Sequence, residues 1–196
     1  MRKIHAATLA ALMFAGTFAL AGCASWLESP NKPANDAIVV ANTHLQKATT
    51  AGAAVTQGSG SLDAISYTKA GAASALDVTA KIKADLATQK DELTAAKAAM
   101  DSIAAMEVSA ELKQYAKLES AALATRVRAV DLGAKLYTEM DKFYTALKTG
   151  KTTSLDTQKI LEGVDTIKRD VTAASELAAQ QSQAATDYFT AQKLGG

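Results

Sequence analysis

The chain of 196 residues has one cysteine, two prolines and one tryptophan, and each scarcity excludes something. With Cys23 alone, no internal disulfide can form, so a folded domain must be stabilised by packing. Both prolines, Pro30 and Pro33, lie in one short polar segment, and residues 34–196 contain none. A long proline-free stretch that is rich in Ala, Leu, Lys, Gln and Glu and poor in aromatic residues is typical of long helices.

Histidine is also scarce, with only His5 and His44 in the whole chain. A metal site built from several imidazole and thiolate ligands is therefore excluded, and the Glu-x-x-His motif of di-metal helical bundles is absent. We expect His44 to be a surface or half-buried helix residue, and acidic pairs such as Asp91-Glu92 to lie on a solvated face. The sequence thus predicts no enzyme, no metal and no cofactor.

The N-terminus has the layout of an export signal. Arg2 and Lys3 precede an apolar run over residues 6–20, which is shorter than the roughly 20 residues that span a bilayer, and the run ends in Leu20-Ala21-Gly22-Cys23. This pattern resembles the lipobox of bacterial lipoproteins, in which cleavage before the cysteine leaves a diacylglycerol on its sulfur. The resemblance covers residues 1–23 only and implies lipidation of Cys23. The alternative, an ordinary signal peptide followed by a free thiol, is disfavoured in an oxidising compartment.

The residue after the cysteine is Ala24. In the lipoprotein family an Asp at this position favours retention in the inner membrane, so the resemblance implies the outer membrane, and we expect the domain to face the periplasm. Trp26 could settle at the membrane interface or pack on the folded domain. Removal of residues 1–22 takes away Arg2 and Lys3 and no acid, which leaves 19 basic against 20 acidic residues. A balance so close to neutral predicts no nucleic-acid partner.

Three breaks divide the proline-free stretch, at residues 57–61, 107–109 and 148–153. We therefore predict four helices, over residues 35–57, 61–106, 109–149 and 154–192. Ser61, Ser109 and either Thr153 or Ser154 are the expected N-caps, with a capping box over residues 153–156, whereas Gly58 and Gly150 are the expected C-terminal stops. The predicted organisation is a signal peptide (1–22), a lipidated tether (23–34) and one helical domain (35–196).

Apolar and small residues form continuous seams at spacings of three and four. The seam of the last helix consists of Ile160, Val164, Ile167, Val171, Ala174, Ala178, Ala185 and Tyr188, interrupted only by Gln181. That of the second helix consists of Ile65, Ala72, Ala75, Thr79, Ile82, Leu86, Gln89, Leu93, Ala96, Met100 and Ile103. The third helix gathers Lys113, Lys117, Arg128, Asp131, Lys135, Glu139 and Lys142 into one polar stripe and has a much wider apolar arc.

These patterns predict an all-α fold: an elongated antiparallel up-down bundle with coiled-coil-like packing, three long helices and a shorter first helix. The short helix is expected to leave part of a groove uncovered, which would favour self-association. The aromatic residues are expected to fill the core without forming a single pocket, because Tyr144 and Tyr188 fall at opposite ends of an antiparallel pair.

Two functions are compatible with this sequence. The first is a lipid-anchored, non-enzymatic scaffold or adaptor that reaches the membrane through its lipid and binds another envelope protein. The second is a binding protein for a small apolar or lipid-like ligand held between helices, since layers rich in alanine can leave space. A cavity of a few hundred Å³ would favour the second function.

Overall fold

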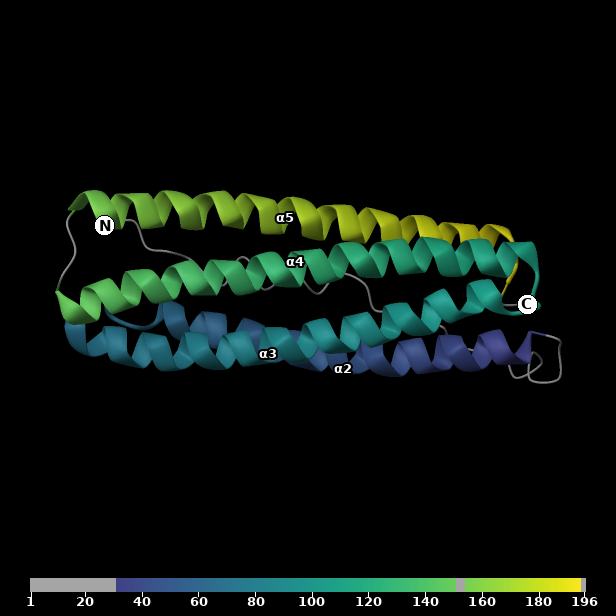
Figure 1. Ribbon diagram of the computed structural model, residues 1–196, viewed down its shortest axis with the longest axis horizontal. Coiled ribbons are helices and arrows are strands. Elements are labelled where there is room, and N and C mark those ends of the chain that lie inside the picture. Colours follow the sequence, from purple (N-terminus) through teal and green to yellow (C-terminus); the bar gives the residue numbers. More distant parts are fainter. Residues whose placement is uncertain (1–30, 151–153, 195–196) are drawn as a thin grey trace.

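The computed structural model describes residues 31–150 and 154–194, nearly all of which lie in four long helices (Figure 1). The helices are α2 (Lys32–Asp63), α3 (Lys69–Ser102), α4 (Ala110–Thr149) and α5 (Ser154–Ala191), and one 3-10 turn, η2 (Ile103–Ala105), follows α3. The part of the chain described contains no strand. The predicted fold class, an all-α elongated antiparallel bundle, is confirmed.

Consecutive helices run in opposite directions along a rod. The start of α2, the connection between α3 and α4, and the end of α5 lie together at one end, which we call the proximal end (right in Figure 1). The connection between α2 and α3, the end of α4 and the start of α5 lie at the other, distal end. At 1.5 Å per residue, the 40 residues of α4 extend over about 60 Å.

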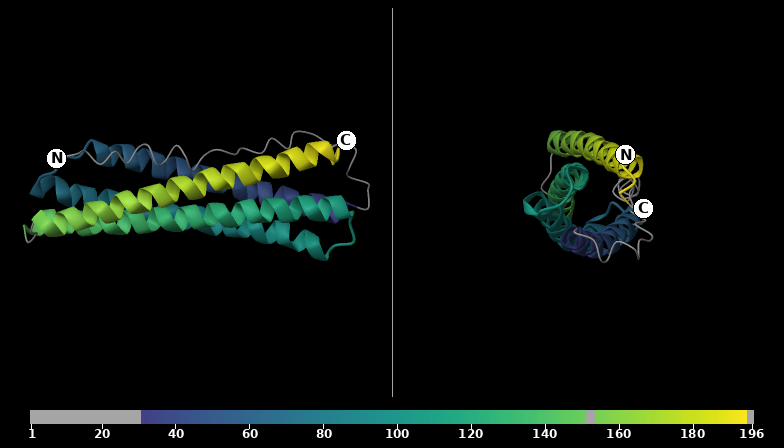
Figure 2. Two further views of the ribbon diagram at one scale, coloured as in Figure 1. Left: turned by 90° about the horizontal axis from the view of Figure 1, so that it is seen from above. Right: turned by 90° about the vertical axis from the view of Figure 1, so that its right-hand side faces the viewer.

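Each helix packs closely against its neighbours in the sequence. Viewed along the rod, the four helices follow an arc with α2 and α5 at its two edges (Figure 2). Within the described residues, no Cα atom of α2 lies within 8 Å of a Cα atom of α5. The inner helices α3 and α4 therefore have two close neighbours each, whereas the outer helices α2 and α5 have one.

The helix ends follow the local chemistry. The side chain of Ser109 accepts a hydrogen bond from the backbone N–H of Leu112, which confirms the predicted N-cap of α4. Gly150 ends α4 in the left-handed conformation at φ 64°, also as predicted, because glycine adopts this conformation without a steric penalty. Asp156 lies in the first turn of α5, but the predicted capping box starts at Thr153, outside the described residues.

The first predicted break is wrong. Gly58 and Gly60 lie inside α2, which continues to Asp63. A Cβ atom on Gly58 would lie 2.6 Å from Cγ1 of Ile82, so this glycine permits close approach of α3 instead of ending the helix. The actual break spans residues 64–68, and the N-cap of α3 is Thr68, whose hydroxyl accepts from the N–H of Gly71; Ser61 caps nothing.

The prediction of a short first helix is wrong for the same reason. α2 has 32 residues, nearly as many as the 34 of α3, and it starts at Lys32 with Pro33 in its first turn. Proline is well tolerated there because the first N–H groups of a helix have no intrahelical acceptor. Residues 32–34, assigned to the tether, are therefore helical, and the length of α2 removes the reason for expecting an uncovered groove.

The core forms where the seams predict it. On α3 every seam residue from Ala72 to Met100 is buried, as is Ile103 in η2, whereas Ile65 lies half-buried in the connection before the helix. On α5 the members Val164, Val171, Ala174, Ala178 and Ala185 are buried, and Ile160, Ile167 and Tyr188 are half-buried. The wide arc of α4 contributes three tyrosines that are at most 2% exposed: Tyr115, Tyr137 and Tyr144.

Candidate functional site

Some sequence-predicted features lie outside the described residues, Cys23 and Trp26 among them. His44 is half-buried on α2, as predicted, and its Nδ1 atom lies 2.6 Å from Oε2 of Glu92 on α3. Asp91 is exposed as expected, whereas Glu92 is half-buried by this pairing. The pair links two neighbouring helices. Across the described residues, no group of three or more His, Cys, Asp or Glu side chains is placed to hold a metal ion.

The aromatic residues form two separate clusters at opposite ends of the rod. Near the distal end, the ring of Phe143 packs against Tyr67 and Tyr144, with centroid distances of 6.0 and 5.3 Å. Near the proximal end, Tyr115 packs against Phe189 at 5.0 Å. Among the described residues no ring contact joins the two sets, in agreement with the predicted absence of a single aromatic pocket. None of the described helices combines the length and the apolar character needed to cross a bilayer.

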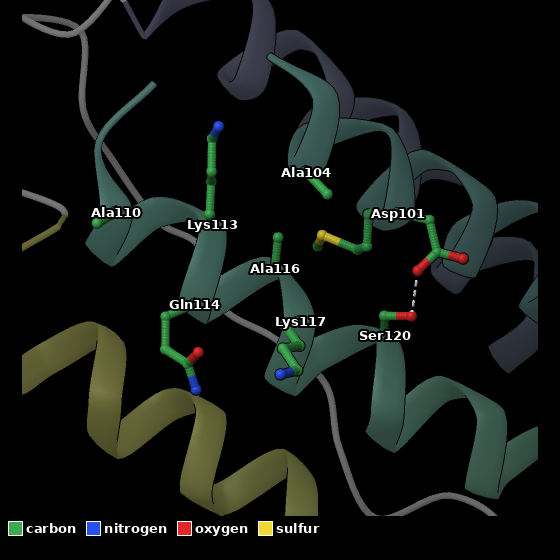
Figure 3. Close-up of a pocket in the computed structure, with 9 residues that line it drawn as sticks. Asp101, Ala104, Ala110, Lys113, Gln114, Ala116, Lys117 and Ser120 are labelled. Atoms are coloured by element: carbon green, nitrogen blue, oxygen red, sulfur yellow. Dashed lines mark hydrogen bonds between the residues drawn. The ribbon is translucent and has the colours of Figure 1, made fainter. Parts of the chain in front are cut away.

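A groove of about 370 Å³ lies at the proximal end, between the last turn of α3 and the first three turns of α4 (Figure 3). Its lining is mostly apolar and includes the buried Met100 and the small side chains of Ala104 and Ala116. Ala104 belongs to η2 and Ala116 to α4, and because both side chains are small, they leave this space unfilled. Lys113 and Lys117, one turn apart on α4, also line it.

Of the charged side chains that line the groove, the acid has an ion-pair partner among the described residues and the two lysines do not. Asp101 on α3 lies 2.6 Å from Nζ of Lys97 and also accepts a hydrogen bond from the hydroxyl of Ser120 (Figure 3). The hydrogen bonds from Lys97 and then Ser120 lower the pKa of Asp101. Among the described residues, neither Lys113 nor Lys117 forms an ion pair. The groove thus combines an apolar floor with two positive charges available to a ligand.

A second polar feature is buried on the face of α4 that packs toward α5. The side chain of Glu119 is 1% exposed, and its Oε1 atom has no hydrogen-bond partner among the described residues. Burial raises the pKa of Glu119 to about 7, although the positive charge of Arg126 opposes the shift. Arg126 donates a hydrogen bond of 3.0 Å to the hydroxyl of Ser182 on α5, and burial lowers its own pKa. These groups join α4 to α5 through polar contacts.

Three further buried oxygens lack a partner among the described residues, and they belong to Gln89, Ser175 and Gln181. Gln181 is the residue that interrupts the apolar seam of α5, and Gln89 is a polar member of the seam of α3. The irregularities of the sequence pattern therefore coincide with polar atoms in the core. None of these three residues lines the groove.

The sequence interpretation assigned Lys113 and Lys117 to a polar stripe and missed both the groove and Glu119. Glu119 lies one turn from Tyr115 and one turn from Leu123, so an acid within the apolar arc was a detectable sign of a buried carboxylate. The groove had no such sign. It depends on Ala104 of η2 facing Ala116 of α4, and that register is fixed only by packing.

No known protein family, curated protein or solved structure matches this chain.

Proposed function

We propose that the protein is a lipid-anchored scaffold of the cell envelope: a helical rod attached to the outer membrane through Cys23 that binds another envelope protein along its surface and catalyses no reaction. The observation that carries this proposal is the position of Lys32 at the proximal tip of the rod. Eight peptide steps join Cys23 to Asn31, which span at most about 29 Å. A lipid on Cys23 would therefore keep the proximal end near the bilayer and place the distal end up to about 60 Å farther away.

The exposed apolar side chains support a role in protein binding. Val39 and Val40 are adjacent on α2 and are 62% and 48% exposed, and Leu177 on α5 is 44% exposed. An isolated exposed apolar residue is common in soluble proteins, but two neighbouring valines in the proximal half of an outer helix form the better contact point for a partner. A second copy of the chain is the alternative occupant.

The anchor is tested by Cys23→Ser. We expect the variant to lack the lipid and to leave the outer-membrane fraction, because no other attachment is proposed. Fractionation after a high-salt wash reports whether the protein stays with the membrane. The mass of the mature N-terminus, measured in parallel, reports whether the lipid is present. Retention in the outer membrane at unchanged electrophoretic mobility would contradict the anchor.

The partner surface is tested by placing a photoreactive amino acid at position 39 in intact cells. We expect one discrete cross-linked product that contains an envelope protein. The same substitution at Lys135, an exposed residue of α4, is the control and should give no such product. Equal cross-linking at both positions would show non-specific contact, and a product of twice the chain mass would identify self-association.

The non-enzymatic part of the proposal is tested at His44. We expect His44→Ala to leave the phenotype intact, because the imidazole contacts only Glu92 among the interactions of the described residues. Stoichiometric metal or cofactor that remains through purification and is lost in this variant would contradict the proposal and place a ligand at His44.

The second candidate function is the binding of a small apolar or lipid-like ligand. One observation favours it: the groove between α3 and α4, whose volume of about 370 Å³ is at the lower end of the usual range for ligand pockets. The two functions are compatible, since the groove and the exposed valines lie on different helices.

A further inference from the structure

We propose that the groove between α3 and α4 binds an anionic amphiphile, that is, a molecule with a negatively charged headgroup and an acyl chain. The proposal rests on the second candidate function and gives it a ligand chemistry. It assigns the acyl chain to the apolar floor of the groove and the headgroup to Lys113 and Lys117.

The floor suits a narrow flexible chain. Met100 is 2% exposed at the base of the groove, and methionine adapts its shape to irregular apolar surfaces. Ala104 and Ala116 face the same space with the smallest apolar side chain, so the groove stays unfilled. A volume of about 370 Å³ that is open to solvent on one side accepts part of an acyl chain with its headgroup outside.

The charge at the rim selects an anion. Elsewhere several lysines are paired with acids, as in Lys90–Asp131 at 2.8 Å and Lys142–Glu139 at 2.6 Å. The one carboxylate that lines the groove, Asp101, is paired with Lys97 and also accepts a hydrogen bond from Ser120. Lys113 and Lys117 therefore remain to bind a carboxylate or phosphate, and a cationic headgroup would be repelled. Their side chains extend in different directions from α4 (Figure 3), so binding of one headgroup by both requires these flexible side chains to turn toward it.

The location of the groove indicates where such a ligand would come from. The groove lies at the proximal end, the end that a lipid on Cys23 would hold near the bilayer. An acidic phospholipid of the membrane and a free fatty acid have the same chemistry, so both are candidate sources. The groove itself does not require the anchor, because all of its lining residues lie in α3, η2 and α4.

The experiment uses the full mature protein reconstituted in phosphatidylcholine vesicles. In one arm the vesicles contain a trace of phosphatidylglycerol with a photoactivatable acyl chain; in the other a photoactivatable fatty acid is added to plain vesicles. Matched probes with a phosphatidylcholine head and an alcohol head control for charge. After illumination, the labelled peptides are identified by mass spectrometry. We expect labelling of the peptides around Met100 and Ala104 by an anionic probe, at least about fivefold above its neutral match.

Two variants test the two halves of the groove. The double substitution Lys113→Glu, Lys117→Glu should lower labelling by about tenfold. Lys135→Glu with Lys148→Glu changes the net charge equally on exposed positions of the same helix and should have no effect. Ala104→Phe fills the groove from an exposed position and should abolish labelling, whereas Ala105→Phe, next to it but outside the lining, should not.

Each outcome has one meaning. Labelling by either anionic probe that depends on both lysines and on Ala104 supports the proposal, and the arm that labels identifies the source. Equal labelling by charged and neutral probes, insensitivity to the lysine reversal, or no labelling in either arm would overturn it. Flotation of the protein with the vesicles reports the anchor separately. Protein that does not float is tested in solution with the fatty-acid probe, so failure of the anchor is distinguished from failure of the groove.

Discussion

Glu119 shows how strongly a single residue can be coupled to the fold. Its carboxyl group lies on the buried face of α4, and its Oε1 atom lacks a partner among the described residues. Desolvation is the largest cause of its raised pKa, and Arg126 offsets it only in part. The neutral acid is therefore the form that the folded protein favours.

This coupling predicts a pH-dependent stability. The pKa of Glu119 rises from 4.5, the ordinary value of a solvated glutamate, to about 7 in the fold, so the acid binds its proton more tightly when folded. The favourable contribution is complete below pH 4.5 and is lost as the pH rises through 7. Glu119→Gln, which cannot ionise, should be more stable than the wild type at pH 8, by up to about 3 kcal/mol, and similar to it at pH 4. Thermal melts across this range measure the difference.

The control for this prediction is Glu111→Gln. Glu111 lies on the same helix but is exposed, so its replacement should change the stability little at any pH between 4 and 8. If the stabilities of Glu119→Gln and the wild type changed with pH in the same way from pH 4 to 8, folding would not raise the pKa of Glu119, and the prediction would be wrong.

At the scale of the helix, the seam of α5 is the most direct test of the packing. Val171 is 0% exposed at the middle of the helix. Val171→Asp would bury an unpaired carboxylate and should cost several kcal/mol, which is a large part of the 5–15 kcal/mol that stabilises a typical domain. Lys135→Asp, on the exposed stripe of α4, should be nearly silent. Equal unfolding midpoints for the two variants would mean that Val171 does not face the core and that the seam has been assigned to the wrong face of α5.

Two glycines near the first connection should respond in opposite directions to the same substitution. A Cβ atom on Gly71 would lie 2.1 Å from the carbonyl oxygen of Ser66, so Gly71→Ala must displace backbone and should destabilise the fold by at least about 1 kcal/mol. Gly60 lies exposed inside α2 with no atom within 4 Å of its added Cβ, so Gly60→Ala should stabilise by about 0.5–1 kcal/mol. Urea unfolding measures the free energy of unfolding of both variants. If Gly60→Ala were less stable than the wild type, residue 60 would not lie inside a helix.

These elements also show what the sequence could and could not predict. Spacing predicted the buried residues of α3 and α5, since the three-four repeat directly records which side faces a partner. Ser109 and Gly150 were correct because their chemistry is local. Gly58 and Gly60 were misread, because a glycine that permits close approach to Ile82 resembles one that ends a helix. The candidate groove could not be predicted, since it depends on alanines of η2 and α4 that only the packing of the folded chain brings together.

At the scale of the molecule, the arc of helices predicts uneven protection. The inner helices α3 and α4 are flanked on two sides, whereas α2 and α5 each have one close neighbour among the described helices. Native-state hydrogen exchange should therefore give higher protection for the central amides of α3 and α4 than for those of α5. Local opening of α5 should expose its own amides without exposing those of α3. Equal protection of all four helices would indicate that α2 and α5 close against each other.

The pairing of consecutive helices also affects how the protein folds. Every close backbone approach between two of the long helices joins neighbours in the chain, although a buried contact between the hydroxyls of Ser59 and Tyr137 also joins α2 to α4. Folds dominated by such local pairings reach their native state quickly, because little loop entropy is lost before contacts form. A chain that is made from its N-terminus can complete the α2–α3 hairpin first and then add α4 and α5 in turn. The rod can therefore be assembled in the direction of its synthesis, with α5 as the last helix to dock.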